Sequence, residues 1–410
     1  MIKKFLNYFI FSILTSLIGF LTTVYIARTI SQESMGIIGL YMAVLFIAPQ
    51  VVSFASIGLI AINKVKLGKE EFVSFSKTYI TFGFINFVII FSISCTISLF
   101  FREYLEIFFI LPIISFLMFI ISFHQAELVQ EGRAKNYGIY NLFNVLAISF
   151  FTIVFVGYLD LDWNSRLWAM LIGYSFVLFV MYKNTFQTLS YFKIIINKVQ
   201  FKEYMNFGLP LFTGLGAGWI LNQADNYIVL HFFTLKDVGI YAVAYSIGSV
   251  VNTINQSVTN AIVPVLYKAL EKKEGNKVVK KLNVYYSIII IAISLIVGSA
   301  SFWYMSIIFG ENYSSSSIIV FFIALSFGFN GIYRTTSGVI IFYKQNSLQM
   351  KLLYISAVIN LGLSIILIPS FGLVSPAIGT LVAYIFLAIS SYIYGWKILK
   401  KEEGIIGRNF

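Results

Sequence analysis

The stretch Phe207–Phe233, FGLPLFTGLGAGWILNQADNYIVLHFF, is the part of the chain that decides its fold class. It is apolar and long enough to cross a bilayer, which takes about 20 mostly apolar residues of helix. Its second half nevertheless carries Asn222, Gln223, Asp225 and Asn226. A carboxylate at membrane depth costs about 2.5–3.5 kcal/mol on insertion scales, so it normally faces a polar partner or a wet cavity. The stretch predicts a transmembrane helix with a functional polar face.

The composition of the whole chain agrees with a membrane protein. Of its 410 residues 59% are hydrophobic and 11% are charged, and the mean hydropathy is +0.86. A soluble domain carries about 25% charged residues, so the surplus apolar surface requires lipid. The net charge of +12 then indicates a membrane surface as partner, and we expect no nucleic acid. One cysteine, Cys95, and two distant histidines, His124 and His231, predict no intrachain disulfide, metal site or cofactor.

Apolar runs of transmembrane length recur along the chain and predict an all-α, polytopic fold with twelve spans. The first run is too long for the apolar core of a signal peptide, so we interpret it as a retained helix. The predicted spans are 5–27, 35–62, 74–101, 105–129, 138–158, 166–186, 207–233, 238–266, 282–309, 316–342, 349–370 and 373–396.

The distribution of Lys and Arg predicts the orientation of these spans. With the N-terminus inside, nearly all of the 29 basic residues fall on the inner side. Cytoplasmic loops of membrane proteins carry such an excess, so both termini are predicted to be cytoplasmic. We expect the bacterial cytoplasmic (inner) membrane. The four outer exceptions are Arg28, Arg102, Arg166 and Lys236.

A weak internal repeat relates the two halves of the chain. The sequence MGIIGLYMAV around Gly36 is matched by VGIYAVAYSI around Gly239, half the chain length later. Six spans per half give both halves the same orientation, a parallel arrangement known among transporters. We therefore predict two pseudo-symmetric six-helix bundles around a central cavity, residues 1–190 and 207–410. Residues 191–206 would form a cytoplasmic interfacial connector between them.

Three groups of polar residues in the second half are candidate substrate contacts. Asp225 shares a helical face with Asn222 and Asn226, which fits either function or an interhelical hydrogen-bonding cluster. Arg334, one turn from Asn330, is predicted to lie inside a span, where it binds an anion, pairs with a carboxylate or snorkels to the interface. The predicted span 238–266 bears a polar stripe that either lines a cavity for sugar hydroxyls or joins helices. The stripe consists of Asn252, Asn255, Gln256, Thr259 and Asn260.

A second candidate site lies at the inner end of the predicted span 105–129. His124 and Glu127 share a helical face there, and Glu131 follows one turn later. A protonatable pair of this kind could couple proton entry to transport, as could Asp225. The alternative interpretation is a polar helix end at the membrane interface.

Two features that are missing from the sequence disfavour particular classes of function. No G-x-x-x-x-G-K-[ST] phosphate-binding loop is present, so we expect no nucleotide hydrolysis by this chain. The predicted outer loops are short and lack clustered acid and base residues, which disfavours a membrane enzyme such as a glycan polymerase or ligase. A scaffold that recruits glycosyltransferases stays open.

Several motifs resemble one known family. Arg28-Thr-Ile-Ser-Gln-Glu-Ser-Met-Gly36-Ile is similar to the R-x-L-[GS]-x-x-x-x-G-x pattern of the polysaccharide-transport branch of the MOP (MATE-like) superfamily. Residues of the second half resemble the seventh and eighth helices of that branch. They are Gly208-Leu-Pro210, Asp225, Val238-Gly239-Ile240-Tyr241 and Pro264.

The resemblance implies a Wzx-type flippase that moves undecaprenyl-diphosphate-linked oligosaccharide, for O-antigen or capsule, from the cytoplasmic to the periplasmic leaflet. It implies a role for Asp225, and for Arg334 as part of a cationic lumen. A glycan polymerase and a chain-length regulator of the same pathway would be partners. The alternative within this superfamily is a MATE-type exporter of cations or drugs.

Overall fold

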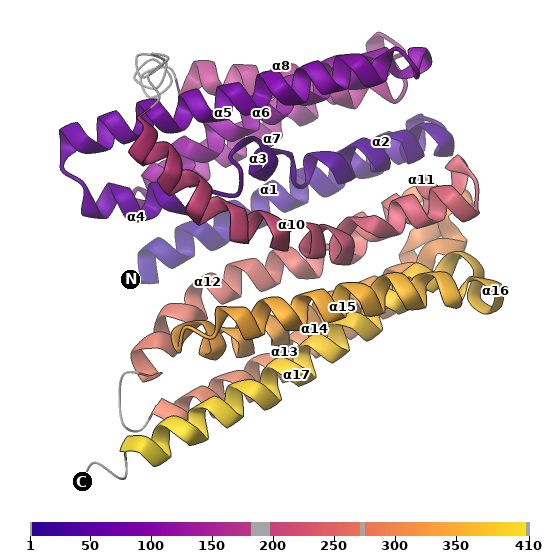
Figure 1. The fold of residues 1–410 in the computed structure, drawn as a ribbon. Coiled ribbons are helices and arrows are strands. Elements are labelled where there is room, and N and C mark those ends of the chain that lie inside the picture. The colour runs from indigo at the N-terminus through magenta and orange to yellow at the C-terminus, as the bar shows by residue number, and fades with distance from the viewer. Residues whose placement is uncertain (1, 182–196, 271–274, 407–410) are drawn as a thin grey trace. The chain divides into compact units, whose positions relative to one another are not determined.

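The computed structural model describes the backbone of residues 2–181, 197–270 and 275–406, and most of the side chains within these ranges. The secondary structure in these ranges is helical (Figure 1). Its elements are α1 Ile2–Thr29, α2 Gln32–Leu45, α3 Ala48–Val52, α4 Gly58–Lys66, α5 Lys69–Ser98, η1 Arg102–Tyr104, α6 Leu105–Gln130, α7 Ala134–Tyr158, α8 Asn164–Val180, α10 Lys198–Phe232, α11 Leu235–Gly248, α12 Val250–Leu270, α13 Gly275–Phe309, η2 Glu311–Ser316, α14 Ser317–Phe342, α15 Asn346–Ile366, α16 Ile368–Phe371, η3 Gly372–Val374 and α17 Ser375–Ile406.

Each of the twelve predicted spans coincides with one helix or with a run of short helices. Among the described residues, nine helical stretches are long and apolar enough to cross a membrane, which confirms a multi-pass membrane protein. The α8 helix is shorter, and α10 and α12 are not among the nine; polar side chains are frequent in both of these helices. The count of twelve crossings therefore stays a prediction.

The chain divides into two compact units, unit 1 at Met1–Gly216 and unit 2 at Ala217–Phe410. The division falls inside α10, which is one continuous helix from Lys198 to Phe232. Residues 182–196 lie outside the described residues. Residues 198–206, in the described part of the predicted connector 191–206, form the first turns of α10, and their place at the interface stays a prediction.

Unit 1 is organised around a core of stacked aromatic rings. Tyr204, in the first part of α10, is fully buried against Phe75 and Tyr79 of α5, with ring centroids 5.4 and 5.5 Å away. Its hydroxyl donates to the Phe75 carbonyl at 2.9 Å. The start of α10 is thereby fixed to unit 1 by packing and by a buried hydrogen bond.

The prediction of one helix over 35–62 is wrong, because the chain breaks there into α2, α3 and α4. Phe54 and Ala55 adopt φ of 51° and 55°, which a right-handed helix cannot accommodate. Broken helices in membranes need partners for the freed backbone groups. Asn86 of α5 supplies one by donating to the Val52 carbonyl at 3.0 Å. The predicted span 238–266 is likewise two helices, α11 and α12, separated at Ser249.

The internal repeat is visible in the local structure of the two units. Ser31 caps α2 by accepting from the Ser34 backbone N–H, and Thr234 caps α11 by accepting from the Asp237 N–H. Both helices contain 14 residues and are followed by a second helical piece after a break. The short polar turn before each Gly-Ile pair is therefore a helix N-cap, as Ser and Thr favour.

Unit 2 surrounds α14, whose side chains are buried along most of its length. Small residues of α14 allow the neighbouring helices to approach it closely. At Gly331 an added Cβ would lie 2.5 Å from the Asn255 Oδ1 of α12, which leaves no room for a larger side chain. The tightly packed α14 carries Asn330 and Arg334 toward α12.

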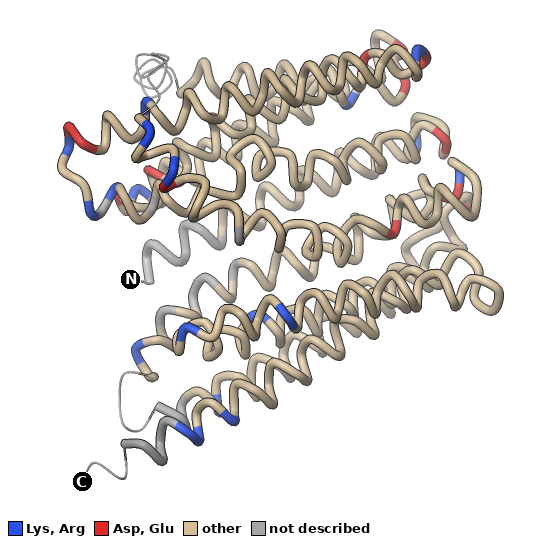
Figure 2. The backbone as a smooth tube through the Cα atoms, in the orientation of Figure 1, with Lys and Arg blue, Asp and Glu red and all other residues tan. Residues whose placement is uncertain are grey.

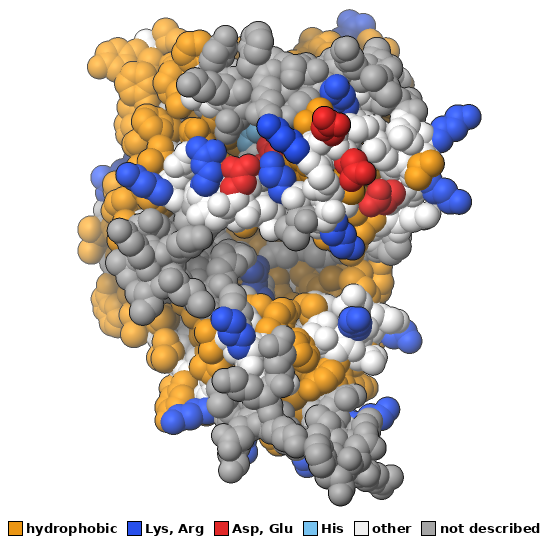
Figure 3. All heavy atoms as spheres, turned by 90° about the vertical axis from the view of Figure 1, so that its left-hand side faces the viewer, with side chains coloured by type: hydrophobic (Ala, Val, Ile, Leu, Met, Phe, Trp, Pro, Cys, Tyr) orange, Lys and Arg blue, Asp and Glu red, His pale blue; other side chains and the backbone are white. Residues whose placement is uncertain are grey.

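Most Lys positions lie toward one end of the helices in each unit, and a smaller mixed group of basic and acidic positions lies at the other end (Figure 2). In unit 1 the lysine-bearing end mixes basic with acidic side chains, as Figure 3 shows. In unit 2 it is formed by the end of α12, the start of α13 and the end of α17, which pack together and carry Lys268, Lys280, Lys281, Lys397 and Lys400. This lysine-rich end of unit 2 is the predicted cytoplasmic side.

Candidate functional site

Arg334 of α14 is surrounded by amide oxygens. Its Nε donates to Asn330 Oδ1 at 3.1 Å, and its Nη2 donates to Asn252 Oδ1 of α12 at 3.3 Å. Its Nη1 donates to Gln256 Oε1. Among the described residues Arg334 forms no salt bridge, so the carboxylate-paired alternative from the sequence is not seen. These neutral acceptors orient the guanidinium and leave its positive charge uncompensated.

An open cavity of about 380 Å³ lies beside Arg334 within unit 2. Arg334 is the one charged residue among the described residues that line it. The other lining residues provide amide, hydroxyl and aromatic groups next to an aliphatic wall. They are Gly218, Leu221, Asn222, Thr259, Val263, Tyr267, Asn330, Tyr333, Ser337, Gly338, Ile341, Gln349, Leu353, Tyr384 and Leu387. Such a cavity suits an anionic ligand that also bears hydroxyl groups.

Asp225 of α10 lies in a buried pocket of hydroxyl groups. It is 1% exposed and is not among the described residues that line the cavity beside Arg334. Its Oδ2 accepts from the Tyr241 hydroxyl at 2.6 Å and from Thr380 Oγ1 at 2.9 Å. Asn360 Nδ2 donates to the same Thr380 Oγ1 at 2.8 Å. Asp225 Oδ1 and Asn360 Oδ1 are buried and have no hydrogen-bond partner among the described residues, so two acceptor oxygens are available there.

The two asparagines on the Asp225 face of α10 differ in their surroundings. Asn222 lines the cavity, where its Oδ1 accepts from the Tyr384 hydroxyl at 3.1 Å and its Nδ2 donates to the Gly218 carbonyl at 2.7 Å. Asn226 is 4% exposed and is not among the lining residues. The helical face predicted from sequence therefore spans the cavity wall at Asn222 and the buried interior at Asp225.

The polar stripe of α12 has two roles in the structure. Asn252 and Gln256 hold Arg334, and Thr259 lines the cavity. Asn255 joins helices instead: its Nδ2 donates to the Phe327 carbonyl at 2.6 Å, and its Oδ1 accepts from Tyr286 at 2.8 Å. The Asn260 side chain lies outside the described residues. Both alternatives for the stripe thus apply, each to different members.

In unit 1 the predicted His124–Glu127 pair belongs to a larger charged cluster. His124 Nδ1 lies 3.5 Å from Glu127 Oε2. Lys64 of α4 lies 3.0 Å from Glu127 Oε1 and 3.2 Å from Glu131 Oε1. Partial burial disfavours the Lys64 ammonium, but the carboxylates of Glu127 and Glu131 outweigh this effect and raise its pKa. The cluster therefore compensates its own charges.

Three residues of these sites are not predicted as site residues from the sequence. Tyr241, present in the family motif, and Thr380 donate to Asp225 but stand in apolar segments where single hydroxyl residues give no periodic signal. Lys64 is one of many inner basic residues. Arg166, predicted in an outer loop, lies in the first turn of α8 and donates to the buried Thr152 Oγ1 at 3.1 Å. No group of three or more His, Cys, Asp or Glu residues that could hold a metal occurs in the described part of the chain.

Comparison with known families identifies the chain. Residues 25–318 match the family described as "Polysaccharide biosynthesis protein". The chain belongs to this family. Its relatives include the capsular polysaccharide biosynthesis protein CapF of Staphylococcus aureus, 23% identical over 97% of this chain and 99% of CapF. Another is Agl15 of Haloferax volcanii, named "Probable low-salt glycan biosynthesis flippase", 25% identical over 41% of this chain and 36% of Agl15.

Solved structures place this polysaccharide biosynthesis protein in a transporter fold. The lipid II flippase MurJ, in an inward closed conformation, aligns with a TM-score of 0.75 at 17% identity, covering 97% of this chain and 90% of MurJ. A multidrug resistance MATE family transporter of the MOP superfamily, in an inward-facing conformation, aligns with a TM-score of 0.70 at 14% identity, covering 97% and 98%. These two likenesses show the fold, and it is the fold that the motifs in the sequence imply.

Proposed function

We propose that this protein is a flippase that translocates undecaprenyl-diphosphate-linked oligosaccharide, an O-antigen or capsule repeat unit, across the bacterial inner membrane. The observation that carries the proposal is the cavity in unit 2, in whose described lining Arg334 is the one charged residue. Arg334 is held by neutral amides, so its charge is available to a ligand. The family and the named relatives, which concern capsular polysaccharide and glycan flipping, support the same substrate class.

Arginine is well suited to bind a diphosphate at membrane depth. It keeps its proton, and its planar fork of N–H donors matches phosphate oxygens in bidentate geometry. An uncompensated cation in a half-buried site is costly, and an anionic ligand offsets that cost. We infer that the diphosphate binds at Arg334, between the side chains of Asn252, Gln256 and Asn330.

The remaining walls of the cavity suit the sugars. Asn222 and Thr259 offer polar atoms that can hydrogen-bond to hydroxyl groups. Tyr267, Tyr333 and Tyr384 offer aromatic faces beside them. The lipid tail would stay in the bilayer while the polar headgroup crosses. A glycan polymerase and a chain-length regulator of the same pathway would then receive the product.

Coupling to an ion gradient is assigned to Asp225. Its buried carboxylate has neutral hydroxyl donors on one oxygen, while the other oxygen and Asn360 Oδ1 are available to a proton or small cation. The His124–Glu127 pair is the alternative coupling site, although Lys64 already engages Glu127. Alternating access would bend α10 near Gly216 and Gly218, where an added Cβ would meet nothing within 4 Å. Both termini would be cytoplasmic.

A MATE-type exporter of cationic drugs is the second candidate, because a MATE transporter shares the fold. A cation-binding cavity needs acidic lining, whereas the described lining of this cavity contains Arg334 and no Asp or Glu. The sign of the charge in the cavity therefore favours the flippase. We also infer that the protein carries out transport and no covalent chemistry.

The test is a flipping assay on the purified chain in proteoliposomes. Three substrates are compared: a fluorescent lipid-linked oligosaccharide with a diphosphate, the same glycan on a neutral lipid, and a cationic dye. We expect translocation of the diphosphate substrate alone. Transport of the dye without transport of the diphosphate lipid would reassign the protein to the exporter class.

A further inference from the structure

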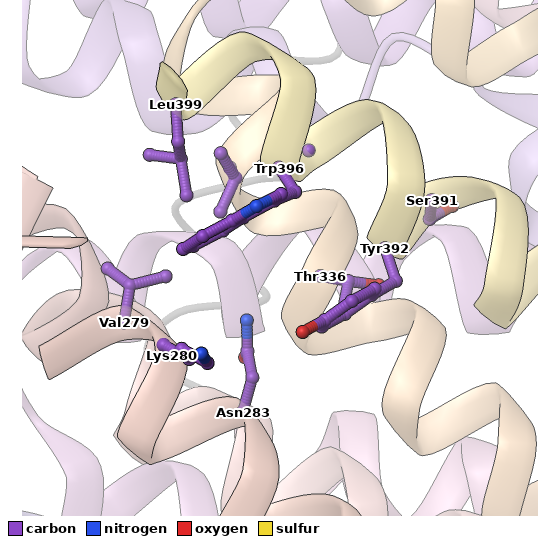
Figure 4. A pocket seen from close by; sticks show the side chains of 10 residues that line it. Val279, Lys280, Asn283, Thr336, Ser391, Tyr392, Trp396 and Leu399 are labelled. Atoms are coloured by element: carbon purple, nitrogen blue, oxygen red, sulfur yellow. The ribbon is translucent and has the colours of Figure 1, made fainter. Parts of the chain in front are cut away.

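A small pocket at the lysine-rich end of unit 2 lies apart from the Arg334 cavity. It is formed by α13, α14 and α17 and has a volume of about 20 Å³, room for about one water-sized group. Its lining includes Lys280 and Asn283 of α13, Thr336 of α14, and Ser391 and Trp396 of α17. In Figure 4 the Asn283 and Tyr392 side chains point toward one another below the Trp396 indole.

Two ammonium groups lie near the Trp396 indole, and one of them, that of Lys280, belongs to a residue that lines the pocket. Lys280 Nζ lies 5.7 Å from the centroid of the Trp396 ring, and Lys400 Nζ lies 5.9 Å from it. Neither lysine forms a salt bridge among the described residues. Two positive charges are therefore positioned by one aromatic ring of the pocket lining.

The interior of the pocket offers polar atoms that lack partners. Asn283 is 7% exposed and Ser391 is fully buried. Asn283 Oδ1 and Ser391 Oγ have no hydrogen-bond partner among the described residues. Buried polar atoms are nearly always hydrogen-bonded, so two such atoms in one pocket indicate a bound water or ligand. Ser391 Oγ can donate to an anion, whereas Asn283 Oδ1 is an acceptor that a water below the anion can satisfy.

The pocket opens among aromatic residues typical of a membrane interface. Tyr392 and Tyr394 of α17 and Tyr285 of α13 are exposed near this end of the unit. Lys281 and Lys397 lie 5.8 and 5.5 Å from the ring centroids of Tyr285 and Tyr394. Tyr and Trp gather at the depth of lipid headgroups, where Lys contacts anionic lipids.

We propose that this pocket binds the headgroup phosphate of an anionic phospholipid, with Lys280 and Lys400 contacting the phosphate and Asn283 and Ser391 hydrogen-bonding to one of its oxygens or to a water below it. The volume admits one oxygen or water, so the body of the phosphate lies over the mouth, next to Lys280. The acyl chains then lie along the exposed apolar surface of α13 and α17, which includes Ile288, Ile289 and Ile393. This site is independent of the transport site at Arg334.

The experiment compares two lipids of identical acyl chains on the full chain in uncharged detergent. Binding of phosphatidylglycerol and of phosphatidylcholine is measured by native mass spectrometry and by the shift in Tm. We expect phosphatidylglycerol to bind and to raise Tm, and phosphatidylcholine to do neither. The Lys280→Gln/Lys400→Gln variant should weaken phosphatidylglycerol binding about thirty-fold, since each lysine near an anionic surface contributes about 1 kcal/mol.

Matched variants separate a built site from general attraction to a basic surface. Lys268→Gln/Lys351→Gln removes the same charge from two exposed lysines outside the pocket, and we expect less than a threefold change. Asn283→Leu keeps every charge and should weaken binding several-fold.

Four outcomes would overturn the proposal. Three are equal losses in the two double variants, equal binding of phosphatidylcholine, and saturation of the site by inorganic phosphate alone at the same concentration. The fourth is a preference of the pocket for a polyprenyl diphosphate over phosphatidylglycerol. In that case the site would belong to the transported lipid.

Discussion

The charged side chains of the candidate sites have different kinds of partner in unit 1 and in unit 2. In unit 1, Lys64 lies within 3.2 Å of two carboxylates, so the cation is compensated by the protein itself. In unit 2, Arg334 has amide oxygens for partners and Asp225 has hydroxyl groups. The guanidinium of Arg334 and the carboxyl group of Asp225 each lack an oppositely charged partner among the described contacts.

This difference in partners distinguishes charged residues that stabilise the fold from charged residues that can bind a ligand or ion. A cluster whose positive and negative charges cancel attracts other ions only weakly. Removing one member mainly leaves its partner's charge unpaired. A charge held by neutral dipoles is oriented but still attracts a counter-ion. We therefore expect ligand binding at Arg334, ion binding at Asp225 and a structural role for the Lys64 cluster.

The largest expected effect is that of Arg334→Ala on flipping. A hydrogen bond to a charged group contributes about 1.5–3 kcal/mol, so the rate at subsaturating diphosphate substrate should fall about 10- to 100-fold. Arg334→Lys keeps the charge without the forked geometry and should recover part of the loss. The measurement is the proteoliposome assay with diphosphate-linked glycan. A wild-type rate for Arg334→Ala would remove Arg334 from the binding site.

A second substitution converts the unit 2 site into the kind of pair seen in unit 1. Gln256→Glu places a carboxylate beside the Arg334 guanidinium, which it would neutralise, and we expect about a tenfold loss of affinity for the diphosphate. Gln256→Met removes the same contact without adding charge and serves as the matched control, with less than a threefold loss. Equal effects of the two substitutions would show that orientation of Arg334, and not its net charge, matters.

The helices could largely be predicted from the sequence because their signal is local. Long apolar runs located each helix, and polar residues inside those runs singled out Asp225 and Arg334. The break at Phe54 and Ala55 could not be predicted, because a positive φ in a non-glycine residue is imposed by surrounding packing. It is Asn86, 34 positions from Val52, that makes this break tolerable.

The partners of the charged residues depend on contacts between distant helices. Asp225 meets Thr380 155 positions away, and Lys64 meets Glu127 63 positions away. Nothing in a single sequence relates such positions. The sequence could therefore nominate Asp225 and Glu127 as candidates, but only the coordinates distinguish a carboxylate with hydroxyl partners from one with an ammonium partner.

The third prediction concerns Asp225, the buried carboxyl group of unit 2. Asp225→Asn retains a side chain of the same shape that can still accept from Tyr241 or Thr380, but it cannot become negatively charged. Flipping in proteoliposomes should lose its several-fold stimulation by an imposed ion gradient, while slow gradient-independent flipping continues. Proton and sodium gradients are imposed separately to identify the ion. Unchanged stimulation in Asp225→Asn, with loss in His124→Asn, would move coupling to unit 1.

The smallest effect is expected where charges already compensate one another. Glu127→Gln leaves Lys64 with Glu131, 3.2 Å away, so the cation keeps one partner. Partly exposed ion pairs contribute about 0–1 kcal/mol, and we expect a loss of stability in that range, seen as a small decrease in Tm. The flipping rate should stay within twofold of wild type.

Glu127→Gln/Glu131→Gln leaves Lys64 without either carboxylate partner and should lower Tm further, whereas adding Lys64→Gln to that variant should restore part of the loss. If the triple variant were instead less stable than the double variant, Lys64 would be held by something other than these two carboxylates, and the contrast between the two units would fail.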